Sequence, residues 1–186
     1  CSRSRAAKAS SRRSSAASTW LGEYPPFCMA NAVDRMLADV TTPNRFELAW
    51  LTGMPVADNT DIMKAAQALG VKNTLVTTAH GMMTGSIGNL YLSPKMALLA
   101  EHRLVDGPSN GLGDLTSALF MSHLLSNVSE ERALKGTIAS VFEVMARAAK
   151  RASDEIMLAE DANSLAHPLA MVQMRRLVMP VRKEPA

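Results

Sequence analysis

Hydrophobic and polar positions along this chain follow two different periods, one typical of strands and one typical of helices. Five apolar residues recur at helical spacing and predict a long helix over Glu130–Lys150, whose stripe packs in the core. The stripe consists of Leu134, Ile138, Val141, Met145 and Ala148. Elsewhere, short β-type runs lie between turn residues. Strands that alternate with helices indicate an α/β domain with a largely parallel or mixed sheet.

Capping and turn residues set the bounds of the other expected elements. Further helices are expected at Met29–Leu37, Asn44–Leu51 and Leu115–Leu125. One more helix should run through Leu69 and end at Gly70, with several possible N-caps in Asp58-Asn59-Thr60. Strands are expected at Asp39–Thr42, Asn73–Thr78, Ile87–Leu92 and Ala97–Val105. The pattern over residues 153–186 is ambiguous: it fits a helix near Asp154–Glu160 and one last element before Pro180.

Three polar segments each follow a predicted strand. They are Pro43-Asn44, Thr77-Thr78 and Gly111–Asp114. Ligands of open α/β sheets bind beyond the carboxyl ends of strands. We therefore expect the three segments to share one edge of the sheet.

The segment Asn110–Asp114 carries the strongest chemical signal. Two glycines lie one residue apart, and Asp114 follows them at the start of a predicted helix. Glycines at a helix start allow close approach of an anion to unpaired backbone N–H groups, which predicts a phosphate cradle. Asp114 would then accept a proton from a hydroxyl that attacks the phosphate. The purely structural alternative is an ordinary turn, in which Asp caps the helix and Gly supplies a positive φ.

Composition indicates one globular domain. The chain has 186 residues, of which 47% are apolar and 20% charged. Aromatic residues make up only 4%, so the 13 methionines, with Ala and Leu, must fill the core. No apolar run approaches the length of a membrane span, so no membrane partner is expected. The two cysteines form no disulfide framework, which favours the cytoplasm.

The positive charge of the chain is confined to its first residues. The net charge is +3, but residues 1–20 contribute +5, so the remaining residues together carry −2. Residues 1–28 read as a disordered basic Ser/Ala/Arg-rich segment, with a composition like that of a transit peptide. A solvated tail is the simpler reading. No nucleic-acid partner is expected, because no basic reading element accompanies this charge.

Five ordered motifs together resemble the ribokinase-like superfamily, and most closely the pyridoxal kinases. The motifs are Ala38–Leu48, Leu75–Thr78, Gly85–Leu90, Glu101–Asp106 and Asn110–Phe120. The resemblance covers residues 29–180, leaving 181–186 as a tail. It implies a three-layer α/β sandwich with a mostly parallel central sheet, incomplete at its N-terminal side.

The resemblance also implies roles at the glycine segment and after the first strand. Asp114 matches the catalytic base, which also contacts the substrate, and Gly111, Leu112 and Gly113 match the anion hole for the γ-phosphate. Asn44 and Glu47 match a pair that contacts ATP and organises Mg²⁺, with Glu47 acting through water.

A further set of residues matches positions beside the nucleotide. They are Thr77, His102, Arg103, Leu104 and Val105. Structural alternatives stay open for several of these matches. Asn44 and Glu47 fit a capping box, Thr77 and Thr78 fit ordinary strand residues, and His102 fits a buried structural histidine.

The activity that the resemblance implies is ATP- and Mg²⁺-dependent phosphorylation of the primary hydroxyl of pyridoxal, by a homodimer. The family's N-terminal half, with most of the pyridoxal pocket, has no counterpart before residue 29. We therefore expect a truncated or frame-altered product with little or no activity. Alternatives are a hydroxymethylpyrimidine or sugar kinase, or a non-catalytic nucleotide-binding remnant.

Overall fold

The computed structural model describes residues 38–106 and 110–180. Its elements, in chain order, are β1 (Val40–Thr41), α1 (Arg45–Thr52), α2 (Asn59–Leu69), β2 (Asn73–His80), β3 (Ser86–Leu92), β4 (Ala97–Arg103), α3 (Leu112–Leu125), α4 (Glu130–Lys150), α5 (Ala162–Ala166) and β5 (Gln173–Leu177). The predicted helix Met29–Leu37, the basic segment 1–28 and the tail 181–186 lie outside the described residues and stay predictions.

The sheet is mixed. Its five strands lie in the order β1-β2-β3-β4-β5, and β1 pairs with β2 in parallel. The other three pairings are antiparallel, so the expected predominance of parallel strands is wrong for the described part. Loop length explains two of these pairings, because short loops join β2 to β3 and β3 to β4. A parallel pairing needs a crossover of a dozen or more residues.

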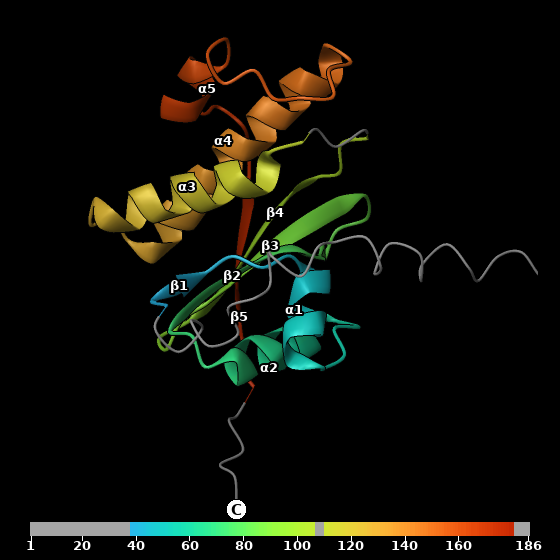
Figure 1. Ribbon diagram of the computed structural model, residues 1–186, viewed down its shortest axis with the longest axis vertical. Helices are drawn as coiled ribbons and strands as arrows, with labels where there is room; N and C mark the ends of the chain where they lie inside the picture. The colour runs from blue at the N-terminus through green and yellow to red at the C-terminus, as the bar shows by residue number, and fades with distance from the viewer. Residues whose placement is uncertain (1–37, 107–109, 181–186) are drawn as a thin grey trace, which may run out of the picture. The chain divides into compact units, whose positions relative to one another are not determined.

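Helices cover both faces of the sheet, which confirms the α/β class and the three-layer arrangement (Figure 1). Leu48 of α1 and Ile62 of α2 pack in one apolar cluster with strand residues on one face. Phe120 of α3 and Leu134 of α4 pack in a second cluster on the other face. Neighbouring strand residues divide between the two clusters because their side chains point to opposite faces.

The long helix was predicted with its bounds. α4 covers Glu130–Lys150, and all five residues of its apolar stripe are buried. α2 also begins and ends as expected: the Asp58 side chain accepts from the Asp61 N–H at 2.8 Å, and Gly70 ends the helix with φ +74°.

The region after α4 differs from the expectation. The predicted helix near Asp154–Glu160 is wrong, because this segment forms turns and a short helix begins only at Ala162. The Ser153 hydroxyl donates to the Glu155 carbonyl at 2.8 Å, a local bond that competes with helix formation. The expected last element is confirmed as strand β5.

Two element ends also shift near the glycine segment. α3 begins at Leu112 rather than Leu115, so Gly113 and Asp114 belong to its first turn. β4 ends at Arg103 rather than Val105. The segment between β4 and α3, residues 104–111, therefore lies two to three residues earlier in the chain than the sequence pattern predicts.

Within the described part of the chain, no helix combines the length and apolarity needed to cross a membrane. A surface cavity of about 450 Å³ is lined by residues 66–67, 70–72, 92–94 and 179–180. These residues lie where β2 begins and β3 ends, at the edge of the sheet opposite the glycine segment. The cavity therefore has no part in the candidate site.

Candidate functional site

The C-terminal ends of β1, β2 and β4 lie at one edge of the sheet. This follows from the pairing, because β1 is parallel to β2 while β3 is antiparallel to both β2 and β4. The Thr42 hydroxyl, just after β1, lies 2.6 Å from the Ser117 hydroxyl in the second turn of α3. The Pro43 carbonyl accepts from the Thr77 N–H at 2.9 Å. The three polar segments thus meet as expected.

The start of α3 is open. Gly111 is its N-cap residue, with φ +86°, a conformation that favours glycine, and no side chain of the described residues caps the helix. The N–H groups of Leu112, Gly113 and Asp114 precede the first helical donor, the Leu115 N–H, which bonds to the Gly111 carbonyl at 3.0 Å. An anion near these three groups would meet unpaired donors and the positive end of the helix dipole.

Gly113 faces open space. A Cβ atom built on it would have no atom within 4 Å, and its φ is not positive. Neither backbone conformation nor packing in the protein therefore requires glycine at this position. The backbone N–H of Gly113 can be approached closely from outside, as an anion hole requires.

Asp114 lies in the same first turn and is exposed. Within the described residues, its carboxylate has no hydrogen-bond or ion-pair partner. A carboxylate that is not engaged elsewhere can accept a proton from a substrate hydroxyl. The predicted base and the predicted anion hole thus lie on consecutive residues of one exposed turn.

The start of α1 is closed by its own side chains. The Asn44 Oδ1 accepts from the N–H groups of Phe46 and Glu47, both at 2.9 Å. The Glu47 Oε2 accepts in return from the Asn44 N–H at 2.8 Å. The capping box that the sequence offered as an alternative is therefore present.

Matches to known proteins agree with this arrangement. The family model described as phosphomethylpyrimidine kinase matches residues 29–157. The chain belongs to this family. The pyridoxal kinase PdxY of Corynebacterium diphtheriae is 32% identical over 76% of the chain and 52% of the relative. The PdxY of Rubrobacter xylanophilus is 35% identical over 82% of the chain and 54% of the relative. The chain thus spans about half the length of these relatives.

Solved structures of the family share the fold. The pyridoxal kinase from Leishmania donovani in complex with ADP and pyridoxamine has a TM-score of 0.73 and 18% identity over 81% of the chain and 55% of that structure. The Plasmodium falciparum PdxK with AMP-PNP and PL has a TM-score of 0.71 and 16% identity over 81% of the chain and 54% of that structure. These structures confirm the fold that the resemblance to pyridoxal kinases implies.

The family's Mg²⁺ site can be tested against the residues after β1. The Asn44 side-chain oxygen already accepts from two N–H groups at the start of α1, and the Glu47 Oε2 already accepts from the Asn44 N–H. The Glu47 Oε1 has no partner among the described residues, and those residues contain no cluster of three metal-binding side chains. Contact with a hydrated cation through Glu47 fits this arrangement, because Mg²⁺ usually keeps several waters.

Thr77 and Thr78 do not end their strand as predicted. β2 continues to His80, and its pairing with β3 shifts register between Val76 and Ala79. Thr78 has φ +55°, which is unusual for a β-branched residue, and its hydroxyl accepts from the Arg45 N–H at 3.3 Å. The bulge brings Thr77 into a bridge with Asn44. A nucleotide contact by Thr77 stays a prediction.

The segment His102–Val105 has mixed surroundings. The His102 ring stacks on Phe142 of α4 at 4.8 Å between centroids, and its Nδ1 donates to the Arg103 carbonyl at 2.9 Å. Burial lowers the pKa of His102, although the bond to this carbonyl opposes the shift. Its side chain therefore has a structural contact, while Arg103 and Leu104 are exposed and Val105 is partly buried. A place beside the nucleotide stays a prediction for these four residues.

Sequence reasoning missed Glu101, which is fully buried on β4. Its Oε2 accepts from the N–H groups of Met82 and Met83 and from the Ser86 hydroxyl, and its Oε1 accepts from the Arg175 Nε at 2.8 Å. Burial alone would raise the pKa of Glu101, but these hydrogen bonds outweigh burial and lower it. A charged residue after four apolar ones in an interior strand was the signal available.

Proposed function

We propose that this chain carries the phosphoryl-transfer site of a pyridoxal kinase, which moves the γ-phosphoryl group of ATP to the primary hydroxyl of pyridoxal. The observation that supports it is the open start of α3, where N–H groups and the Asp114 carboxylate, without partners among the described residues, occupy one exposed turn. The curated relatives named pyridoxal kinase support the choice of substrate.

In this proposal, Asp114 accepts the proton of the substrate hydroxyl as its oxygen attacks the γ-phosphorus. The bond from that phosphorus to the bridging oxygen breaks, and ADP leaves with the electron pair. The N–H groups of Gly111, Leu112 and Gly113 donate to the phosphoryl oxygens as their charge is redistributed. Such preorganised donors are a main source of rate enhancement in phosphoryl transfer.

Asn44 and Glu47 would lie near the phosphates and hold Mg²⁺ through water, with Thr77 and the segment His102–Val105 beside the nucleotide. When bound, Mg²⁺ neutralises phosphate charge. The Thr42–Ser117 contact supports the proximity, since it joins the loop before Asn44 to the helix that carries Asp114. A homodimer in the cytoplasm also belongs to this proposal, and sedimentation of the purified chain tests the dimer.

Calorimetry with ATP and Mg²⁺ is the first test, because the chain spans about half the length of its relatives. We expect saturable binding at one site per chain. Absence of binding by the folded chain would overturn the proposal. Binding with no turnover of pyridoxal in a coupled assay would favour a nucleotide-binding remnant. Turnover of hydroxymethylpyrimidine in place of pyridoxal would favour the related kinase.

Asp114→Asn is the decisive variant for the mechanism. It removes the proton acceptor but keeps the size of the side chain, so turnover should fall about 10²- to 10⁴-fold. ATP affinity should change only a few-fold, since the anion hole uses backbone groups. Ser122→Ala on the exposed surface of the same helix is a control that should leave both values unchanged. Unchanged turnover in Asp114→Asn would exclude this residue as the base.

A further inference from the structure

The segment between α4 and α5 lies against the start of the glycine segment. The Asn110 N–H donates to the Asp154 carbonyl at 2.9 Å, and Asn110 forms a parallel bridge with Glu155. Ile156 packs beside Gly111: a Cβ built on Gly111 would lie 3.4 Å from the Ile156 Cδ1. The backbone just before α3 thus has direct contacts with residues 154–156.

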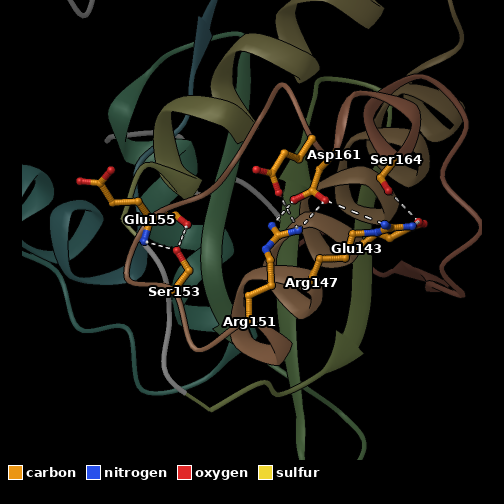
Figure 2. Close-up of polar contacts among 8 residues, drawn as sticks. Glu143, Arg147, Arg151, Ser153, Glu155, Asp161 and Ser164 are labelled. Carbon is orange, nitrogen blue, oxygen red and sulfur yellow. Dashed lines mark hydrogen bonds and ion pairs between the residues drawn. The ribbon is translucent and has the colours of Figure 1, made fainter.

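An ion pair joins the two ends of the segment between α4 and α5. Arg151 follows the last residue of α4 and donates from both terminal nitrogens to Asp161, at 3.0 Å and 2.5 Å (Figure 2). Asp161 is only 1% exposed, and the Arg147 Nη1 lies 3.9 Å from its Oδ1. A buried carboxylate needs such partners, and a bidentate pair also fixes geometry. The two ends of residues 151–161 are therefore joined across the turns that contact Asn110.

α3 depends on these outside contacts because its own N-cap residue has no side chain. α1 fixes its first turn through Asn44 and Glu47, whereas Gly111 offers no side-chain bond. The direction of the first N–H groups of α3 is then set by the backbone before it. That backbone bonds to Asp154 through Asn110.

We propose that the Arg151–Asp161 ion pair is a positioning element for the anion hole. It holds residues 154–156 in place, and these hold Asn110 and Gly111 so that the N–H groups of Leu112 and Gly113 face a bound phosphate. Neither charged residue touches the nucleotide. The inference rests on the proposed function, but its structural step can be tested separately.

Glu143 provides a matched control. It lies on the same helix, and its carboxylate accepts from the Ser164 hydroxyl at 2.8 Å and from Arg147 at 3.2 Å (Figure 2). It also accepts from the Leu169 N–H at 2.8 Å. These bonds tie α4 to α5 and to the chain before β5. Among the described residues, Glu143 has no bond to Asn110 or to residues 154–156. Arg147 contacts both Glu143 and Asp161, but both close bonds to Asp161 come from Arg151. Loss of Glu143 therefore tests destabilisation while the Arg151–Asp161 pair stays in place.

The experiment compares Asp161→Asn, Arg151→Met and Glu143→Gln in the full chain. Amide exchange measured by NMR should become at least tenfold faster for the Asn110 N–H in the first two variants. ATP affinity in the presence of Mg²⁺ should fall about tenfold in the same two. Glu143→Gln should leave both values within twofold. Arg151→Lys keeps the charge but cannot make the two parallel hydrogen bonds of the guanidinium. Its exchange rate and ATP affinity should therefore fall between those of wild type and Arg151→Met.

Each outcome decides a separate point. Unchanged Asn110 exchange in Asp161→Asn and Arg151→Met overturns the inference, as does faster exchange with unchanged ATP affinity. Equal effects in Glu143→Gln also overturn it, because general destabilisation then explains the result. If Asp161→Asn does not fold, Arg151→Lys gives the same comparison with a milder change. If the wild-type chain binds no ATP, the proposed function fails, while Asn110 exchange still tests the structural step.

Discussion

α1 and α3 begin at the same edge of the sheet but solve the same problem in opposite ways. The first N–H groups of any α-helix have no partner within the helix. In α1, Asn44 and Glu47 satisfy these groups from within the element. In α3, Gly111 leaves them open, and the first turn presents Gly113 and Asp114 to solvent. The difference separates a helix start built for stability from one that is available to a ligand.

The open start has an energetic cost that packing must offset. A side-chain cap contributes about 1 kcal/mol to a helix. α3 has no such cap among the described residues, but it buries Leu115, Thr116 and Phe120. Tertiary packing can therefore stabilise a helix whose N-terminus has no side-chain cap.

Gly113→Ala should have the largest effect, and it should change ATP affinity without lowering stability. The methyl group would occupy the open space in front of the N–H groups, so ATP affinity should fall about 10- to 100-fold, as expected for lost hydrogen bonds to a charged group. The melting temperature should stay equal or rise, because Ala is the better helix former. Calorimetry and thermal unfolding measure the two effects.

Gly53 supplies the control for this variant. It also has open space around a Cβ, but it ends α1 with φ +66°. Gly53→Ala should therefore lower stability by about 1 kcal/mol and leave ATP affinity unchanged. If Gly113→Ala instead lowered stability and spared ATP affinity, α3 would be an ordinary helix start and the contrast would fail.

Acid should destabilise the protein through three carboxylates. The Arg151 hydrogen bonds lower the pKa of Asp161, and the Leu169 N–H bond is the main cause that lowers the pKa of Glu143. The hydrogen bonds from Arg175 and the Met82–Met83 turn outweigh burial and lower the pKa of Glu101. Groups with a lowered pKa contribute stability above their ordinary pKa, and this stability is lost as the pH falls through the lowered value.

The free energy of unfolding should therefore decrease below about pH 4.5, as measured by urea denaturation. Glu101→Gln should cost about 2 kcal/mol at neutral pH and make the remaining pH dependence shallower. A pH profile identical in slope to that of the wild type would show that Glu101 does not contribute.

Asn44→Ala should have the smallest effect and act on stability through α1. It removes the acceptor for two N–H groups and should lower the free energy of unfolding by about 1 kcal/mol. Asn44→Ser keeps a capping oxygen and should recover most of the loss. Denaturant titration of the three proteins checks this order. Equal stability of all three would mean that the capping box contributes nothing to α1.

Local signals in the sequence predicted most of the elements and the place where the three polar segments meet. Asp58 and Gly70 delimit α2 through bonds made within a few residues, so their effect can be read from the chain. The apolar stripe of α4 could be predicted because its spacing is also a local property of the sequence. The antiparallel direction of β3 is also legible in the chain, because the loops on either side of it are too short for a parallel crossover.

The features that sequence reasoning missed depend on contacts between distant residues. Thr78 adopts its positive φ in a bulge next to the α1 start, and no property of threonine predicts that conformation. Glu101 accepts a hydrogen bond from Arg175, which lies on the neighbouring strand β5 and 74 positions later in the chain. The turns at Asp154–Glu160 form where Arg151 bonds to Asp161 rather than within a continuous helix. Such pairings become visible only when the tertiary structure is known.

The open space at Gly113 has an evolutionary consequence. Folding places no demand on glycine there, whereas the positive φ of Gly111 demands it at the neighbouring position. If the proposed site is lost in a lineage, alanine can be accepted at position 113 without harm to the fold, while the positive φ at position 111 still favours glycine. The two neighbouring glycines would then report on different constraints: position 111 on folding, and position 113 on binding.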